Sequence, residues 1–183
     1  KVHIKSIQES KRGFIGSFIP FIKHPLSIFS QFYSEGDIIN QVVVRKVSSA
    51  LANVEIRNDK SKDINVNVYI GEISNICRID NYQTLSNLIT ECPKMVKLID
   101  YEHNCVELSL KMVLEANNET RFKLDYDTKY EAIIIGRKHQ KYIVILKDLW
   151  IEGFLESSKK YNNGDELIVW MTAYGTQYAY FIE

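Results

Sequence analysis

The fold is decided by the stretch YEAIIIGRKHQKYIVIL, residues 130–146. Two runs rich in β-branched residues flank a short polar turn, and this pattern predicts a β-hairpin. Three similar runs follow: IEGFL (151–155), LIVWM (167–171) and YAYFI (178–182). Five short strands separated by Gly, Asn, Asp and Lys favour a small closed β-barrel.

The residues before this stretch repeat the pattern. Gly36 to Lys111 divides into five similar runs, so one architectural unit is predicted to occur twice. We therefore expect an all-β protein with two tandem five-stranded barrels. Helical periodicity is weak, and it indicates only two short helices, at 84–89 and 157–161.

Two further segments lie outside the predicted barrels. Residues 112–126 are polar and turn-rich, so we expect a linker there. Residues 1–35 carry five basic and two acidic groups, and they contain the predicted hairpin VHIKSI (2–7) and GFIGSFI (13–19). The predicted domains are therefore residues 1–35, 36–111, 112–126 and 127–183.

The apolar stretch from Phe14 to Phe32 is expected to pack against a barrel or a partner, since it would otherwise be an exposed hydrophobic patch. The chain starts Lys1-Val2-His3 without a methionine. We expect it to be a segment of a larger protein.

Composition excludes several classes of function. The 23 Lys and Arg residues balance the 23 Asp and Glu residues, which argues against binding of polyanions by bulk positive charge. Cys77, Cys92 and Cys105 lack metal-ligand spacing and favour a reducing compartment, the cytoplasm or the nucleus. No apolar run approaches the roughly 20 residues of a membrane-spanning helix. We expect no cofactor, no metal and no membrane partner.

The familiar catalytic motifs are also missing from the sequence. It contains no phosphate-binding Gly-rich loop, no Gly-x-Ser-x-Gly elbow, no His-Glu-x-x-His pair and no acidic cluster suited to two metals. Cys92 and Cys105 are expected to be small buried residues rather than nucleophiles. We therefore predict no catalytic residue and no enzymatic activity.

Several motifs carry a resemblance to a known family. They are Gly36-Asp-Ile-Ile39, Tyr69-Ile-Gly-Glu-Ile-Ser74, the run 95–111, Ile151-Glu-Gly-Phe-Leu155 and the run 161–167. In these motifs the chain resembles the S1-type RNA-binding repeat, an oligonucleotide/oligosaccharide-binding (OB) barrel found in ribosomal proteins, polynucleotide phosphorylase and the exosome cap. The resemblance implies two tandem OB-fold barrels, and residues 1–18 look like the closing hairpin of a preceding repeat.

The resemblance also implies a binding site in the second barrel. It places His139 and Tyr142 at the family's base-stacking positions, and Arg137, Lys138 and Lys141 are the cations expected to hold phosphates. Strand alternation is consistent with this, because Tyr142 points away from the core if Ile143 and Ile145 face it. Glu156 falls at the position of a family histidine, where a carboxylate would repel phosphate unless it pairs with a cation. The alternative for 137–141 is an ordinary solvated turn.

The first barrel departs further from the family pattern. SSALAN (48–53) replaces the segment that bears aromatic residues, so only Tyr69 remains as a stacking candidate, with Arg45, Lys46 and Arg78 as weaker backbone contacts. His3, His24 and His103 lack ligand spacing. Trp150 and Trp170 are expected to be packing or interface residues.

These observations predict a non-catalytic segment of a larger multi-repeat protein that binds single-stranded RNA. The alternative is a protein-interaction scaffold that docks within an RNA-processing or ribosome-associated assembly. The zero net charge, the first barrel without stacking rings and the apolar stretch from Phe14 to Phe32 favour that alternative. A third possibility is a decoy that competes for the partner of another OB protein.

Overall fold

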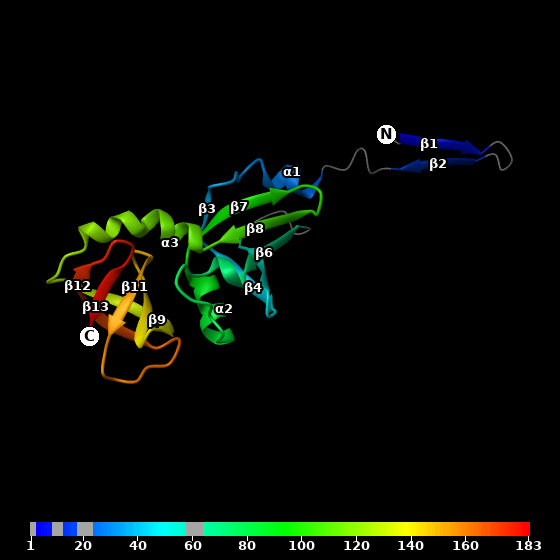
Figure 1. Ribbon diagram of the computed structural model, residues 1–183. Coiled ribbons are helices and arrows are strands. Elements are labelled where there is room, and N and C mark those ends of the chain that lie inside the picture. The colour runs from blue at the N-terminus through cyan, green and yellow to red at the C-terminus, as the bar shows by residue number, and fades with distance from the viewer. Residues whose placement is uncertain (1–2, 9–12, 18–23, 58–63) are drawn as a thin grey trace.

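The protein, in a computed structural model, is described over residues 3–8, 13–17, 24–57 and 64–183. It is mostly β, and Figure 1 shows a sheet unit followed by a barrel at the C-terminal end. The first unit is a curled six-stranded sheet in the order β3-β7-β8-β6-β5-β4. Its strands are β3 (Ile38–Ile39), β4 (Val42–Val47), β5 (Leu51–Ile56), β6 (Asn65–Tyr69), β7 (Lys94–Asp100) and β8 (Cys105–Ser109).

The second unit is a closed barrel in the order β10-β11-β13-β12-β9. Its strands are β9 (Lys129–Lys138), β10 (Lys141–Leu146), β11 (Ile151–Glu156), β12 (Glu166–Tyr174) and β13 (Ala179–Ile182). The strands predicted at its five apolar runs are confirmed. The first unit pairs in a related order, with β3 on β7 and β4 on β5, but it does not close.

The N-terminal segment begins with a two-stranded sheet. Strands β1 (His3–Gln8) and β2 (Gly13–Ser17) pair antiparallel, so the predicted hairpin is confirmed. Helix α1 (Pro25–Phe29) follows, and its Leu26 and Phe29 side chains are fully buried in the first unit. The described part of the predicted apolar stretch thus packs in part on this unit, although Phe32 is 64% exposed. Residues 18–23 lie outside the described residues.

One of the two predicted helices is present. Helix α2 (Tyr82–Glu91) starts where the Asn81 side chain accepts a hydrogen bond from the Thr84 amide at 2.9 Å, and it ends at Cys92, before Pro93. The helix predicted at 157–161 is wrong. There the Lys159 amide donates to the Ser157 hydroxyl and the Tyr161 amide donates to the Tyr142 hydroxyl, so the backbone amides bond to side chains instead.

The segment predicted as a polar linker is instead helical. It contains α3 (Lys111–Asn117) and the 3₁₀ helix η4 (Asn118–Lys123). Another 3₁₀ turn, η3 (Ile70–Glu72), follows β6 in the first unit. Val113 and Leu114 of α3 are buried in the core. In Figure 1, α3 lies alongside the barrel. The connection is therefore a packed element rather than an extended tether.

The hydrophobic core continues from one unit into the other. One cluster fills the barrel interior, whereas the second combines the first unit with Ile133, Ile135, Ile143 and Ile145 from the outside of β9 and β10. All four are at most 4% exposed. The outer face of these two barrel strands is therefore covered by the first unit.

Candidate nucleic-acid interface

The β9–β10 turn carries the cations predicted for the second barrel. His139 and Gln140 have φ values of 49° and 66°, as a two-residue hairpin loop with two left-handed residues requires. Arg137, Lys138 and His139 are exposed, and Lys141 is half-buried. Lys138 and Lys141 are directly opposite each other in the ladder, so their side chains share one face of the hairpin.

The prediction that Tyr142 offers a stacking surface is wrong. Its side chain is 5% exposed and lies among the residues of the barrel interior. Its hydroxyl donates to the Lys159 carbonyl at 3.2 Å and accepts from the Tyr161 amide at 3.1 Å. The Tyr161 ring packs edge-on against it, and the Arg137 guanidinium lies 5.3 Å from its ring centroid. Tyr142 is a structural residue with no free ring face for a base.

The alternation used in that prediction was correct, but its direction was reversed. Ile143 and Ile145 do share a face opposite to Tyr142. That face, however, is outside the barrel and is buried by the first unit. Because both faces of β10 are buried, the apolar pattern alone did not indicate which face points into the barrel.

Glu156 is paired with a cation. Its carboxylate is expected to repel phosphate unless such a pair forms. The Lys141 ammonium donates to the Glu156 carboxylate across β10 and β11. Both side chains are more than one-third exposed, so the pair is screened by solvent and contributes little to stability. Lys141 remains available to a ligand that competes with Glu156.

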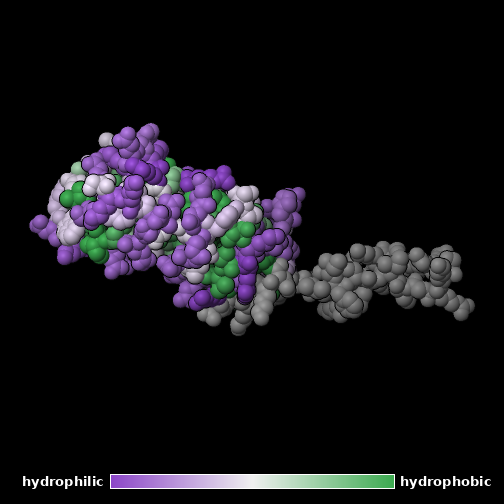
Figure 2. Space-filling model, turned by 90° about the horizontal axis from the view of Figure 1, so that it is seen from below, coloured by the Kyte–Doolittle hydropathy of each residue, from purple (hydrophilic) through white to green (hydrophobic). Residues whose placement is uncertain are grey.

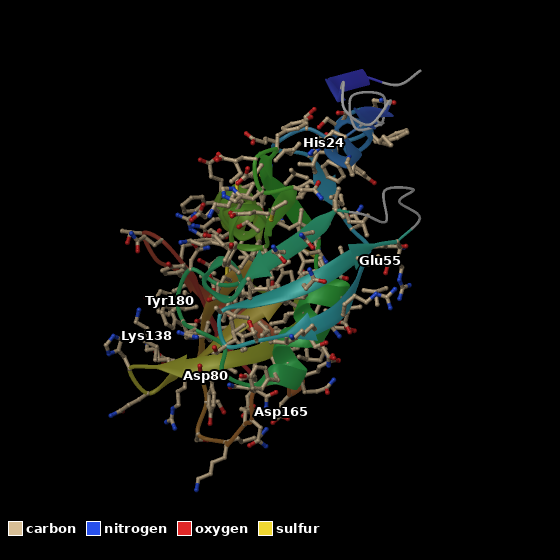
Figure 3. All side chains as sticks on the ribbon, turned by 90° about the vertical axis from the view of Figure 1, so that its right-hand side faces the viewer. His24, Glu55, Asp80, Lys138, Asp165 and Tyr180 are labelled. Carbon is tan, nitrogen blue, oxygen red and sulfur yellow. The ribbon has the colours of Figure 1, made fainter. Side chains whose placement is uncertain are left out.

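The residues predicted in the first unit form a separate group. Arg45 donates from Nε to Glu55 at 2.7 Å in an exposed, solvent-screened pair, and Lys46 is exposed. Tyr69 is 37% exposed at the end of β6. In the part of the chain that the structure describes, none of the three shares a hydrogen bond or ion pair with residues 137–142. Figure 3 places Glu55 on the edge opposite to Lys138.

A group of aromatic rings that the sequence reasoning missed lies on the outer face of the barrel. Phe154 and Tyr180 are stacked with centroids 5.7 Å apart and planes inclined by 24°. Tyr178 packs edge-on against Phe154 at 5.6 Å. All three are partly exposed, and Lys141 Nζ lies 4.8 Å from the Tyr180 centroid. We call Phe154, Tyr178 and Tyr180 the ring face.

The alternation of residues along β11 and β13 predicts the ring face once Gly153 and Phe181 are known to point inward. A Cβ on Gly153 would lie 2.5 Å from the Phe181 ring, so these two residues meet inside the barrel. Strict alternation then places Phe154 and Tyr180 outside. The ladder pairs Phe154 directly with Tyr180, which brings the two rings together.

The ring face borders a polar contact between the two units. Glu152, 3% exposed on β11, accepts hydrogen bonds from the Ser74 hydroxyl and, at 3.0 Å, from the Asn75 amide. Burial raises the pKa of the Glu152 carboxyl, although these hydrogen bonds lower it in part. Nearby, a Cβ on Gly136 would lie 2.8 Å from Cys77 Sγ. The loop 74–77 therefore sits directly on strands β9 and β11.

Two hollows flank this contact. The larger, about 570 Å³ and open to solvent, is lined by residues of the first unit: Ser49, Ala50, Ile70, Gly71, Ser74, Asn75, Ile76, Cys77 and Arg78. The smaller, about 200 Å³, contains Asn75 and Glu152 together with Tyr178 of the ring face. Arg78 donates to the Ser49 carbonyl at 2.6 Å, and its Nε lies 3.9 Å from Asp80.

Within the described ranges, no group of three or more His, Cys, Asp or Glu side chains is arranged to hold a metal ion. Among the same residues, none of the helices has the length and hydropathy needed to cross a bilayer.

Comparisons with known proteins give a weak structural likeness. The sequence matches no known family profile and no curated protein. A solved structure described as a multidomain protein with nucleic acid binding domains, from Streptococcus pneumoniae TIGR4, is 11% identical with a TM-score of 0.45. The alignment covers 82% of this chain and 53% of that one, so this chain spans about half the length of its structural neighbour.

Proposed function

We propose that this chain is a non-catalytic segment that binds single-stranded RNA on the ring face. The observation that carries the proposal is the stack of Phe154 on Tyr180 with the Lys141 ammonium above the Tyr180 ring. Proteins bind single strands by combining aromatic surfaces for bases with cations for the backbone. Each stacked base contributes about 1–3 kcal/mol, so one ring decides whether such a site works.

The position of the ring face within the barrel supports this proposal. OB barrels bind oligonucleotides on the face of their second and third strands and on the adjoining loops. Counted along the barrel, these strands are β10 and β11. Because the first unit covers Ile143 and Ile145 on the outer face of β10, only the part of this face near Lys141 and Phe154 is accessible. We propose that both units are OB folds of the S1 type, the first open and the second closed.

The chemistry of the cysteines supports a non-catalytic role. Burial raises the pKa of Cys77 to about 11, and it also raises the pKa values of the Cys92 and Cys105 thiols. The thiolate is the nucleophilic form, and raised pKa values keep these thiols protonated near neutral pH. The intracellular compartment and the larger parent protein remain predictions.

The test is a titration of the whole chain with a fluorescein-labelled oligouridine at moderate salt. Tyr180→Ala should weaken binding about tenfold, the loss of one stacked base, while Tyr180→Phe should keep most of the affinity. Tyr126→Ala is the control, because Tyr126 is a more exposed tyrosine, at 49%, that lies near Tyr174 at another place on the barrel. Equal affinity of Tyr180→Ala and the unaltered protein would reject the ring face as the site.

A second candidate function is protein docking, and a separate cluster favours it. Phe122 and Tyr126 are 58% and 49% exposed, and both contact the ring of Tyr174. Figure 2 shows that the face seen from below is mostly hydrophilic, with separate hydrophobic patches over both units. A salt series distinguishes the two functions, because RNA binding weakens steeply as salt rises and apolar docking does not.

A further inference from the structure

The larger hollow of the first unit lies next to the cations of the barrel. Lys138 Nζ donates to the carbonyl of Ile76 at 3.4 Å, and Ile76 lines the hollow. Arg78 stands at the rim of the same hollow with 64% of its side chain exposed. Arg78 thus lines the hollow, and Lys138 of the barrel contacts a residue that lines it.

Two opposed lysines connect this hollow to the ring face. Lys138 and Lys141 are cross-strand partners, whose Cβ atoms lie about 5 Å apart in such a ladder. Lys138 donates a hydrogen bond to the carbonyl of Ile76, which lines the hollow, whereas the Lys141 ammonium lies over the ring of Tyr180.

The contact between the units fixes the distance between the hollow and the rings. Asn75 lines both hollows, and its amide donates to the buried Glu152 carboxylate at 3.0 Å. Tyr178 of the ring face lines the smaller hollow beside it. One buried cluster underlies both surfaces, because it contains Ile76 of the hollow and has Phe154 and Tyr178 of the ring face packed against it.

We propose that one RNA strand crosses from the ring face into the hollow of the first unit, with Arg78 holding a phosphate there. This inference rests on the proposed function, and it makes the two units a single composite site. Bases stack on Phe154 and Tyr180, the backbone passes Lys141 and Lys138, and the next nucleotides enter the hollow beside Arg78.

The guanidinium of Arg78 is suited to this role. It carries five N–H donors, and the hydrogen bond to the Ser49 carbonyl orients it while leaving other donors free. The opposing charge is Asp80, which is 88% exposed and only loosely paired at 3.9 Å. A phosphate that approaches Arg78 therefore competes with a weak, screened partner.

The experiment is a ladder of labelled oligouridines from about 3 to about 16 nucleotides, which spans the site sizes of OB folds. For the unaltered chain, affinity should rise in a step once the oligonucleotide is long enough to reach the hollow. Arg78→Ala should lower the affinity of long oligonucleotides about fivefold and leave the shortest unchanged. Asp80→Asn should strengthen binding of long oligonucleotides only. Arg57→Ala, which removes an exposed arginine elsewhere in the same unit, is the control.

The outcomes separate this inference from the proposed function. If Tyr180→Ala weakens binding at every length but Arg78→Ala has no effect, the crossing strand is rejected and the ring face stands. If Arg78→Ala lowers the affinity for short and long oligonucleotides equally, Arg78 contacts RNA of every length. The proposed path from the ring face to the hollow is then rejected. If neither variant changes affinity, both proposals fall.

Discussion

The hydroxyl of Ser74 donates a hydrogen bond to the carboxylate of Glu152, 78 residues further along the chain. Both residues are buried, at 8% and 3% exposed. The Ser74 oxygen also accepts from the amides of Ile76 and Cys77 at 3.1 and 3.2 Å. One small side chain therefore shapes the loop 74–77 and fastens it to β11.

Ser74→Ala should lower the free energy of unfolding by about 2–3 kcal/mol, because two backbone amides lose their acceptor and the buried Glu152 carboxylate loses one of its donors, keeping the Asn75 amide. Urea denaturation measures the change. Ser157→Ala removes a hydroxyl that donates to Glu183 and accepts from the Lys159 amide, a bond exposed to solvent, and should cost about 1 kcal/mol or less. Equal losses in the two variants would contradict the role of Ser74.

Glu152 should make stability depend on pH. Its raised pKa means that the folded protein keeps a proton that the unfolded chain has already released, so stability falls as pH rises from the ordinary glutamate value through the raised one. Glu152→Gln should remove this part of the slope. Urea midpoints measured across the mildly acidic range would show it, and an unchanged slope in the variant would count against the assignment.

Lys94 should shift stability at the alkaline end. Its side chain is fully buried, its ammonium donates to the Ile89 carbonyl, and burial lowers its pKa from 10.5 to about 8. The unfolded chain binds more protons between these values, so stability rises with pH from about 8 to 10.5. Lys94→Met should be more stable at neutral pH by up to about 3 kcal/mol and should lack the rise.

Thermal unfolding at neutral and alkaline pH tests that prediction. Lys160→Met replaces an exposed lysine and should behave as the unaltered protein does. A Lys94→Met variant that is less stable at neutral pH would mean that the hydrogen bond to Ile89 outweighs the cost of burying the charge.

Gly136 should be intolerant of any side chain. A Cβ there would lie 2.8 Å from Cys77 Sγ, so Gly136→Ala should destabilise the contact between the units by about 1–3 kcal/mol. Cys77→Ala removes the sulfur and leaves its Cβ 3.6 Å away, an ordinary contact. The double variant should regain part of the loss in a double-mutant cycle. Additive losses would show that the clash lies elsewhere.

Tyr142→Phe separates structure from binding. The variant loses the hydroxyl that joins Lys159 and Tyr161, so the free energy of unfolding should fall by about 1 kcal/mol or more. Affinity for oligouridine should stay unchanged, because the ring is inside the barrel. A loss of affinity at unchanged stability would restore Tyr142 to the binding surface.

The strands were largely predictable because β-branched residues dominate them and turn residues separate them. Helix α2 was predictable from its apolar spacing, whereas α3 was hidden in a polar stretch and has only Val113 and Leu114 as buried residues. Arg137, Lys138 and Lys141 lie at the ends of β9 and β10, beside the turn His139–Gln140, and their role in binding stays a prediction. The stacking residue was not predictable, since an apolar strand such as β10 can be buried on both faces and its sequence does not show which face points inward.

The ring face illustrates a second reason why the site could not be predicted from the sequence. Phe154 and Tyr180 are 26 residues apart and meet only because β11 and β13 pair in parallel. Pairing between distant strands is a tertiary property, so no local pattern places these rings side by side. Gly153 was the available clue, because the absence of a side chain marks the position where Phe181 crosses it.

The four isoleucines on the outside of β9 and β10 have a practical consequence. If the chain were cut between residues 126 and 127, these isoleucines would lose the first unit that buries them. Each fragment would then expose a hydrophobic patch and tend to aggregate. The two units should therefore be expressed and crystallised together. For the same reason, a recombination event could transfer them to another protein only as one piece.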